Sequence, residues 1–276
     1  MRILCIALFS VCLSLPAMAS SKVIATGGST SIEGAAGGGI VPWAVINGYA
    51  SSEQWSVNSF TSRVGVADFT LQNVGIGASY NNQWEVSLTR QHFNLDSIGG
   101  NLQQDIFGLK YHVAGELLYT NMPQISVGLQ YKKHRNAALP FAVGAQKDTG
   151  TDLYLAASKV YFAAVAGRNL LLNATVRATK ANQIGLLGFG GVHDNSYQYM
   201  VESSAAVLLR PDLAVGIEFR QKPNNLAFAD EEHWRDIFVG WFINRHFSLV
   251  GGYVDLGSIA GLARQQGYYL ALEATF

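Results

Sequence analysis

Ten ionisable residues recur at alternate positions in stretches where apolar and polar side chains alternate. Because successive side chains of a β-strand point to opposite faces, this spacing places all ten opposite an apolar face. With histidine neutral, they comprise five cations and four anions. Unpaired charges in an enclosed interior are costly, so this near-balance predicts ion pairs across a lumen. The ten are Glu85, Lys110, His112, Lys132, Lys159, Arg177, Glu202, Glu218, Arg220 and Glu273.

No other residues form a recognisable catalytic or metal-binding pattern. The six histidines lack the His-x-x-x-His and His-Glu-x-x-His spacings of metal sites. Two clusters, His193-Asp194 and Glu231-Glu232-His233, could meet at a rim of loops, but no Ser/His/Asp arrangement accompanies them. We therefore expect no enzyme, metal or cofactor. An enzyme would require His193 and His233 to approach each other.

The composition excludes several classes of protein. The chain has 276 residues with no net charge at pH 7, and 14% of them are charged, against about 25% in an average soluble domain. A neutral chain without basic residues interleaved with aromatic ones is not expected to bind nucleic acid. Apolar residues never fill the roughly 18 consecutive positions of a transmembrane helix. A bundle of such helices is therefore excluded.

The elements that position the ten charges are short strands. Short links such as 81–83, 210–212 and 244–246 alternate with longer ones, as in bacterial outer-membrane barrels. We predict an all-β fold, a transmembrane antiparallel up-and-down β-barrel of about 12 strands with both termini periplasmic. A soluble β-sandwich would show more charge on its outer face. The strands are expected near 39–51, 68–80, 84–94, 104–114, 124–134, 151–162, 169–180, 197–209, 213–222, 234–243, 247–257 and 267–276.

The amino-terminal region divides into two parts. Residues 1–19 have the basic residue, apolar stretch and small-residue end of a signal peptide cleaved after Ala19, which predicts export to the outer membrane of a Gram-negative bacterium. Both cysteines, Cys5 and Cys12, leave with it. Residues 20–38 are rich in Gly, Ser and Ala, and we expect a flexible lead or a plug folded into the lumen, with the barrel occupying 39–276. The Gly-rich loop 185–191 is expected to fold inward and constrict the pore.

Two further sequence features indicate partners. The chain ends in an apolar stripe closed by aromatic residues, which resembles the signal strand that barrel assembly machinery reads. The basic run 132–135 lies at the outer end of a strand, where it could contact lipopolysaccharide phosphates in addition to membrane lipid, or simply be solvated. The stripe consists of Tyr268, Leu270, Leu272 and Phe276.

The chain also resembles a family of proteobacterial outer-membrane barrel proteins grouped as domain of unknown function 3034. This resemblance implies an outer-membrane barrel and supplies no catalytic or ligand residues. It rests on Thr26-Gly27-Gly28, Glu33-Gly34-Ala35-Ala36-Gly37-Gly38-Gly39, Pro42-Trp43-Ala44, Gly150-Thr151-Asp152-Leu153-Tyr154, Thr175-Val176-Arg177-Ala178-Thr179-Lys180-Ala181-Asn182-Gln183 with the Gly-rich run that follows, and Lys222-Pro223-Asn224-Asn225-Leu226.

We expect from these features a passive channel or binding barrel for a small polar solute. The alternatives are a structural or surface-interaction barrel with a blocked lumen and, less favoured, an outer-membrane enzyme.

Overall fold

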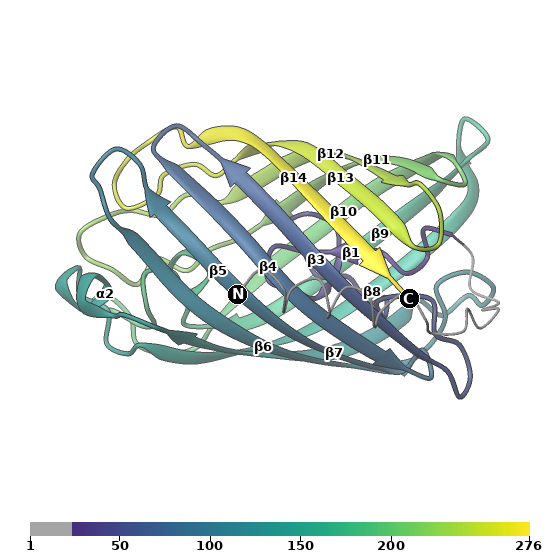
Figure 1. The fold of residues 1–276 in the computed structure, drawn as a ribbon, viewed down its shortest axis with the longest axis horizontal. Coiled ribbons are helices and arrows are strands. Elements are labelled where there is room, and N and C mark those ends of the chain that lie inside the picture. Colours follow the sequence, from purple (N-terminus) through teal and green to yellow (C-terminus); the bar gives the residue numbers. More distant parts are fainter. Residues whose placement is uncertain (1–23) are drawn as a thin grey trace, which may run out of the picture.

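The alternating segments of the sequence form the strands of a closed barrel in the computed structural model, which describes residues 24–276 (Figure 1). The signal peptide and its cleavage site lie outside the described residues. Each strand pairs antiparallel with its neighbours in the chain, and β14 pairs with β3 to close the barrel, with Tyr268 opposite Gly65. The twelve strands are β3 (Trp55–Gly65), β4 (Phe69–Tyr80), β5 (Trp84–Leu95), β6 (Asn101–Ala114), β7 (Gln124–His134), β8 (Thr149–Val165), β9 (Arg168–Thr179), β10 (Gln198–Arg210), β11 (Leu213–Arg220), β12 (Trp234–Phe242), β13 (Phe247–Asp255) and β14 (Gln266–Thr275).

The predicted twelve-stranded antiparallel barrel is confirmed, but one predicted strand is wrong. Residues 39–51 form no barrel strand, and the first one is instead β3 (Trp55–Gly65). The reason lies in the side chains of β3, since both of its faces mix apolar and polar residues. Its alternation is therefore a weaker signal for a strand than the apolar run 40–46. That run is buried, but it lies outside the strands of the barrel. The barrel accordingly begins at Trp55 and not at residue 39.

The two ends of the barrel differ in their connections. At the end where the chain enters β3 and leaves β14, most links are short: 81–83, 166–167, 211–212 and 243–246. The other end carries longer loops, including helix α2 (Ala138–Ala142) and the 3-10 helix η2 (Asn182–Gly185). In outer-membrane barrels the short turns are periplasmic and the long loops extracellular. Two links depart from this rule, the long periplasmic link 115–123 and the short extracellular turn 66–68.

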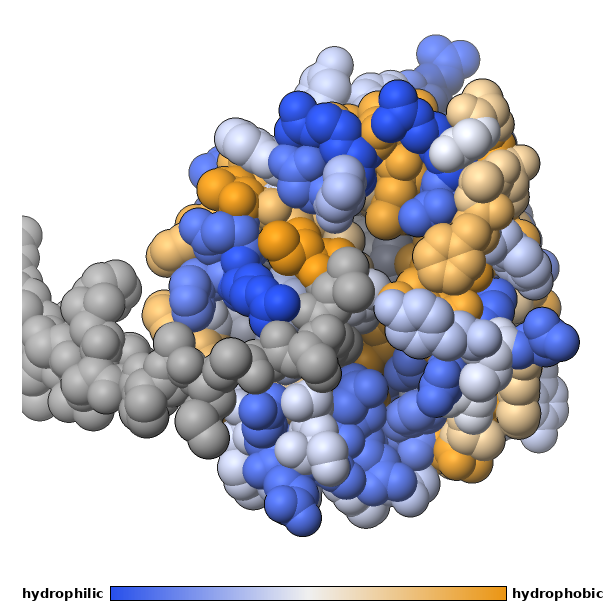
Figure 2. Space-filling view, turned by 90° about the vertical axis from the view of Figure 1, so that its right-hand side faces the viewer, coloured by the Kyte–Doolittle hydropathy of each residue, from blue (hydrophilic) through white to orange (hydrophobic). Residues whose placement is uncertain are grey.

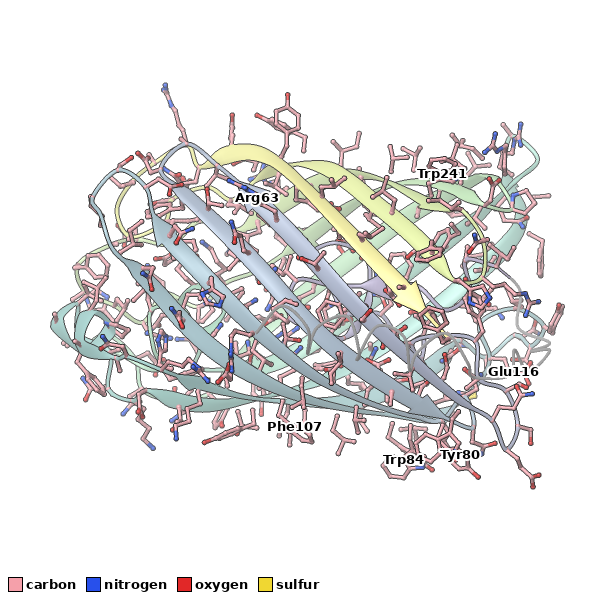
Figure 3. All side chains as sticks on the ribbon, in the orientation of Figure 1. Arg63, Tyr80, Trp84, Phe107, Glu116 and Trp241 are labelled. Carbon is pink, nitrogen blue, oxygen red and sulfur yellow. The ribbon has the colours of Figure 1, made fainter. Side chains whose placement is uncertain are left out.

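The outer face of the barrel is an apolar belt with aromatic borders. Ile76, Leu270 and Leu272 are among its exposed apolar side chains. Figure 3 shows Tyr80, Trp84 and Trp241 pointing away from the barrel near its periplasmic end. Trp55 packs on Tyr80, and Trp84 packs on Tyr111, with ring centroids 4.7 and 4.4 Å apart. Tyr199, Tyr253 and Tyr268 are exposed toward the other end. Such a belt between two aromatic girdles is the lipid-facing surface of a membrane barrel.

The periplasmic end itself is largely hydrophilic, as Figure 2 shows when the barrel is viewed end-on. No helix among the described residues is long and apolar enough to cross a membrane.

The lumen of the barrel holds the segment that precedes β3. We call residues 24–50 the lumen segment, because every residue from 27 to 48 is buried and its contacts are with inward-facing side chains of the strands. Within it, β1 (Ser29–Thr30) and β2 (Ala36–Gly37) form a small antiparallel pair. The segment thus extends further than the Gly-rich stretch 20–38 that the sequence delimits.

Candidate functional site

The lumen segment has little regular structure, so hydrogen bonds within it, such as those from Ile32 to Gly39 and from Trp43 to Ala36, satisfy only part of its buried backbone groups. Side chains of the barrel wall supply partners for others. Glu85 accepts backbone N–H bonds from Ala36 at 3.0 Å and from Asn47 at 2.8 Å. Lys110, which forms an ion pair with Glu85 at 3.2 Å, donates to the carbonyls of Ala36 and Val45 at 2.9 and 3.0 Å.

Other strands of the wall bind the segment in the same way. Glu218 accepts from the backbone N–H of Ile40 at 2.7 Å and from the indole N–H of Trp43 at 3.2 Å. Glu273 accepts from the hydroxyl of Thr30 at 2.6 Å. Uncharged wall residues, namely Gln91, Gln124, Ser126, Ser158, Asn173 and Thr175, hydrogen-bond further backbone groups of the segment.

Glycine is required where the segment runs closest to the wall. A Cβ on Gly38 would lie 2.1 Å from Oε1 of Glu218, and one on Gly34 would lie 2.0 Å from Oγ1 of Thr89. Gly34 also has a φ of +91°, which L side chains rarely adopt. The Gly-rich composition therefore permits a close approach between this backbone and the polar side chains of the wall.

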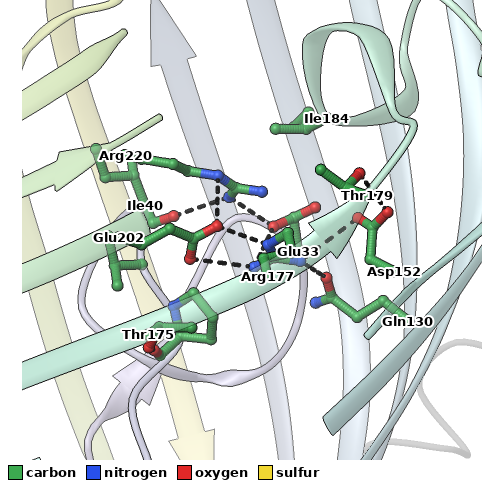
Figure 4. A network of polar contacts seen from close by, with 12 residues as sticks. Glu33, Ile40, Gln130, Asp152, Thr175, Arg177, Thr179, Ile184, Glu202 and Arg220 are labelled. Atoms are coloured by element: carbon green, nitrogen blue, oxygen red, sulfur yellow. Dashed lines mark hydrogen bonds and ion pairs between the residues drawn. The ribbon is translucent and has the colours of Figure 1, made fainter. Parts of the chain in front are cut away.

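The centre of the contact is the carboxylate of Glu33, which is 1% exposed. Its Oε1 pairs with Nζ of Lys132 from β7, and its Oε2 lies 2.6 Å from Nη1 of Arg220 from β11 and 3.5 Å from Nη2 of Arg177 from β9. Figure 4 shows Arg177 and Arg220 converging on Glu33. We call Lys132, Arg177 and Arg220 the cation cage.

Two carboxylates of the wall complete the network. Glu202 pairs with Nε of Arg177 at 2.6 Å and with Nε of Arg220 at 3.3 Å. Asp152 pairs with Lys132 at 2.6 Å and with Arg177 at 3.5 Å. The wall alone thus contributes three cations and two anions, and Glu33 brings the sum to zero.

The expected pairing across the lumen takes a different form from the one predicted. The wall pairs Glu85–Lys110, Asp152–Lys132 and Glu202–Arg177 each join neighbouring strands. Among the described residues, only Glu33 forms ion pairs with strands that are not neighbours, because Lys132 on β7 and Arg220 on β11 have three strands between them. The crossing ion pairs therefore run through the lumen segment and not directly from wall to wall.

The ten predicted lumen residues separate into two groups. Eight of them, all except His112 and Lys159, contact the lumen segment or the network around Glu33. His112 and Lys159 lie at the periplasmic end, where they bind the link 115–123. His112 contacts the carbonyl of Gly115 at 2.9 Å, and Lys159 donates to the carbonyls of Glu116 and Leu118 at 3.2 Å.

Several residues of the site were not among those predicted. Glu33 lies in an irregular segment without periodicity, and both Glu33 and Asp152 occur in the motifs that carry the family resemblance. Asp236 and Tyr269 lie on inward positions of β12 and β14, where the buried carboxylate of Asp236 and the hydroxyl of Tyr269 contact each other. Strict alternation along β12 is the signal that could have identified Asp236, although apolar residues occupy both faces of that strand.

The basic run 132–135 is split between the two faces of β7 and its end. Lys132 and His134 are buried in the lumen, whereas Lys133 and Arg135 are exposed. Arg135 forms an ion pair with Asp105 at 2.9 Å. The four residues therefore do not form one surface patch, and a contact with lipopolysaccharide phosphates remains a prediction for Lys133 and Arg135 alone.

The carboxyl-terminal stripe lies on the outside of the barrel. Tyr268, Leu270, Leu272 and Phe276 are all exposed. Their recognition by assembly machinery remains a prediction.

The loop 180–197 covers the extracellular side of the lumen segment. Residues 181–191 are all buried, and the carbonyl of Ile184 accepts hydrogen bonds from Lys132 at 3.0 Å and Gln104 at 3.3 Å. Ile32 and Leu186 belong to one apolar cluster. The neighbouring loop contributes a buried ion pair, Lys222–Glu231 at 2.9 Å. Burial lowers the pKa of Lys222 and raises that of Glu231, and their mutual attraction opposes both shifts.

No hydrogen bond among residues 24–276 joins the two loop clusters considered for catalysis. His193 and His233 share no hydrogen bond: the backbone N–H of His193 donates to Asn225, and Nδ1 of His233 accepts from the backbone N–H of Lys222. No group of three or more His, Cys, Asp or Glu in the described part of the chain could hold a metal ion.

A closed antiparallel barrel with an apolar outer belt, aromatic girdles and a polar interior is an outer-membrane β-barrel. The chain belongs to the family described as "Protein of unknown function (DUF3034)", whose model matches residues 26–273. This match confirms the resemblance drawn from its motifs. No curated protein matches the sequence.

Solved structures similar to this chain are outer-membrane barrels. The KdgM porin is 10% identical with a TM-score of 0.48, over 80% of this chain and 99% of that one. The NanC porin is 10% identical with a TM-score of 0.45, over 81% and 99%. An outer membrane channel from Pseudomonas putida F1 is 8% identical with a TM-score of 0.48, over 81% and 95%. At such identities the likeness concerns the barrel fold alone.

The charge network predicts a dependence of stability on pH. Burial by itself raises the pKa of Glu33, but Arg220, Lys132 and Arg177 together hold it well below its ordinary value of 4.5. Above pH 4.5 the ionised Glu33 therefore stabilises the folded state, and this contribution is lost as the pH falls toward the folded pKa. The free energy of unfolding should decrease by roughly 1.4 kcal/mol per pH unit in that range. Urea titrations at several pH values should show this slope, and Glu33→Gln should lack this component.

Proposed function

We propose that this protein is a passive outer-membrane conduit for a small polar solute, closed by its own lumen segment until that segment is displaced. The observation that carries the proposal is the polarity of the contact between the segment and the wall. Twelve strands lie between the eight-stranded barrels filled by their own side chains and the 16-stranded porins that hold an aqueous channel. A barrel of this size can therefore enclose a removable segment.

A polar contact has a physical consequence that an apolar one lacks. Buried ion pairs contribute little net stability compared with apolar packing of the same volume. When a segment leaves an apolar wall, the wall tends to exclude water and to remain closed to ions. Here the wall would retain Glu85, Lys110, Glu218 and the cation cage, which water can hydrate. The vacated lumen would then be a charged aqueous path, and those charges would set its selectivity.

A permanently closed barrel with a structural or surface role is the second candidate. It is favoured by the apolar part of the interior, where Ile32 and Ile40 pack with Phe69, Phe93 and Leu186. Such packing would hold the lumen segment in place under the loop 180–197.

Planar-bilayer conductance separates the two candidates. We expect the protein that starts at Ser20 to be closed most of the time, and a variant lacking residues 24–50 to give steady discrete openings. A variant lacking residues 186–190 serves as the matched control, because it shortens the extracellular loop and keeps the lumen segment. It should stay closed, whereas combining both deletions should give the largest conductance. A folded but silent 24–50 deletion would contradict the conduit and favour the closed barrel.

A further inference from the structure

We propose that the cation cage is a binding site for the carboxylate of a small monocarboxylate solute, and that Glu33 occupies this site while the lumen segment is in place. The inference rests on the proposed function, because it names the class of solute that the conduit would take.

The charge of the wall is the first argument. Lys132, Arg177 and Arg220 converge from β7, β9 and β11, and all three are almost completely buried. The wall neutralises only two of these cations, through Asp152 and Glu202. Without Glu33 the site would hold one uncompensated positive charge. A buried uncompensated charge is costly, so a vacated cage would attract an anion.

The geometry of the cage selects the type of anion. The two carboxylate oxygens of Glu33 form ion pairs with different cations: Oε1 pairs with Lys132, and Oε2 pairs with Arg220 and Arg177. Guanidinium groups and a nearby ammonium group suit the two oxygens of a carboxylate. A dianion would overcompensate the single positive charge, and a cation would be repelled by it. A ligand with one carboxylate therefore fits both the shape and the charge.

Glu33 is tethered to the barrel, which sets the concentration at which a free solute competes. An intramolecular group acts at an effective concentration on the order of millimolar. A free carboxylate should therefore bind the cage of the native protein only at millimolar concentrations or above. In a variant without the Glu33 carboxylate, the same free carboxylate should bind the cage at lower concentrations.

Acetate and Glu33→Ala provide a direct test of the site. The substitution removes a methylene group and a carboxylate, which together match acetate in size. We expect acetate to raise the thermal unfolding midpoint of Glu33→Ala in detergent, with saturation, while chloride at equal ionic strength does not. Adding Arg220→Gln should abolish the response. Asp212→Ala, which removes a partly exposed carboxylate paired with Arg210, is the matched control and should show no response to acetate.

Equal responses to acetate and chloride, or an acetate response that survives Arg220→Gln, would overturn the site. If Glu33→Ala does not fold alone, the yield of folded barrel in refolding mixtures replaces the midpoint as the readout. Acetate must then raise that yield more than chloride does, and failure to do so overturns the proposal equally.

A cysteine probe tests whether the solute also displaces the segment. Ser31 is buried in the lumen segment and its hydroxyl has no hydrogen-bond partner among residues 24–276, so Ser31→Cys should be tolerated. The only native cysteines, Cys5 and Cys12, precede the predicted cleavage point. We expect acetate to accelerate labelling of this cysteine by a soluble maleimide. Rescue of Glu33→Ala without faster labelling would support the carboxylate site and refute solute-driven release of the lumen segment. Conductance of the 24–50 deletion tests the conduit separately.

Discussion

Arg177→Gln should destabilise the folded barrel by about 3–5 kcal/mol, the loss expected when one partner of a buried ion-pair network is removed. Arg177 is 1% exposed and contacts Glu202 and the side-chain oxygen of Gln130, both at 2.6 Å. It also lies 3.5 Å from Asp152. Removing the guanidinium group leaves these acids with too few cations in a site that water does not reach. Equilibrium urea unfolding of the refolded protein in lipid vesicles measures the difference.

Arg210→Gln is the matched control for this substitution. Arg210 forms an ion pair with Asp212 at 2.8 Å, a distance similar to that of Arg177 to Glu202, but both side chains are substantially exposed at a periplasmic turn. Exposed pairs contribute little because water screens them. A loss of stability in Arg177→Gln no greater than in Arg210→Gln would show that the central network is hydrated and not buried.

The period-two pattern predicted the wall of the site because an alternating strand exposes every second residue to the lumen. Eight charged residues identified in this way contact the lumen segment or its network. The pattern could not show what those residues bind. Glu33 lies in a segment whose conformation depends on hydrogen bonds to side chains more than 50 residues away, such as Lys132 and Arg220. No local propensity encodes that placement.

The start of the barrel was mispredicted for a related reason. Ile40, Val41 and Trp43 are apolar because they pack inside the lumen, and an apolar run resembles a buried strand. In β3, Ser59 and Thr61 face outward while Phe60 and Val64 face inward, so neither face is uniformly apolar. Because the lumen segment packs inside the barrel, some inward-facing residues of the strands are apolar. The usual contrast between an apolar lipid face and a polar lumen face is therefore weaker in β3.

Ile76→Arg should cost about 2–4 kcal/mol in a bilayer, the range observed for a cation facing the middle of the membrane on a barrel. Ile76 is exposed on β4, two outward positions from Tyr80 of the periplasmic girdle and two from Gln72 toward the extracellular end. An arginine at this depth must either leave its charge in hydrocarbon or stretch toward the interface. Urea unfolding in lipid vesicles compares it with Gln72→Arg, which places the same charge on the same face near the rim and should change stability little. Equal effects of the two substitutions would contradict the position of the lipid belt.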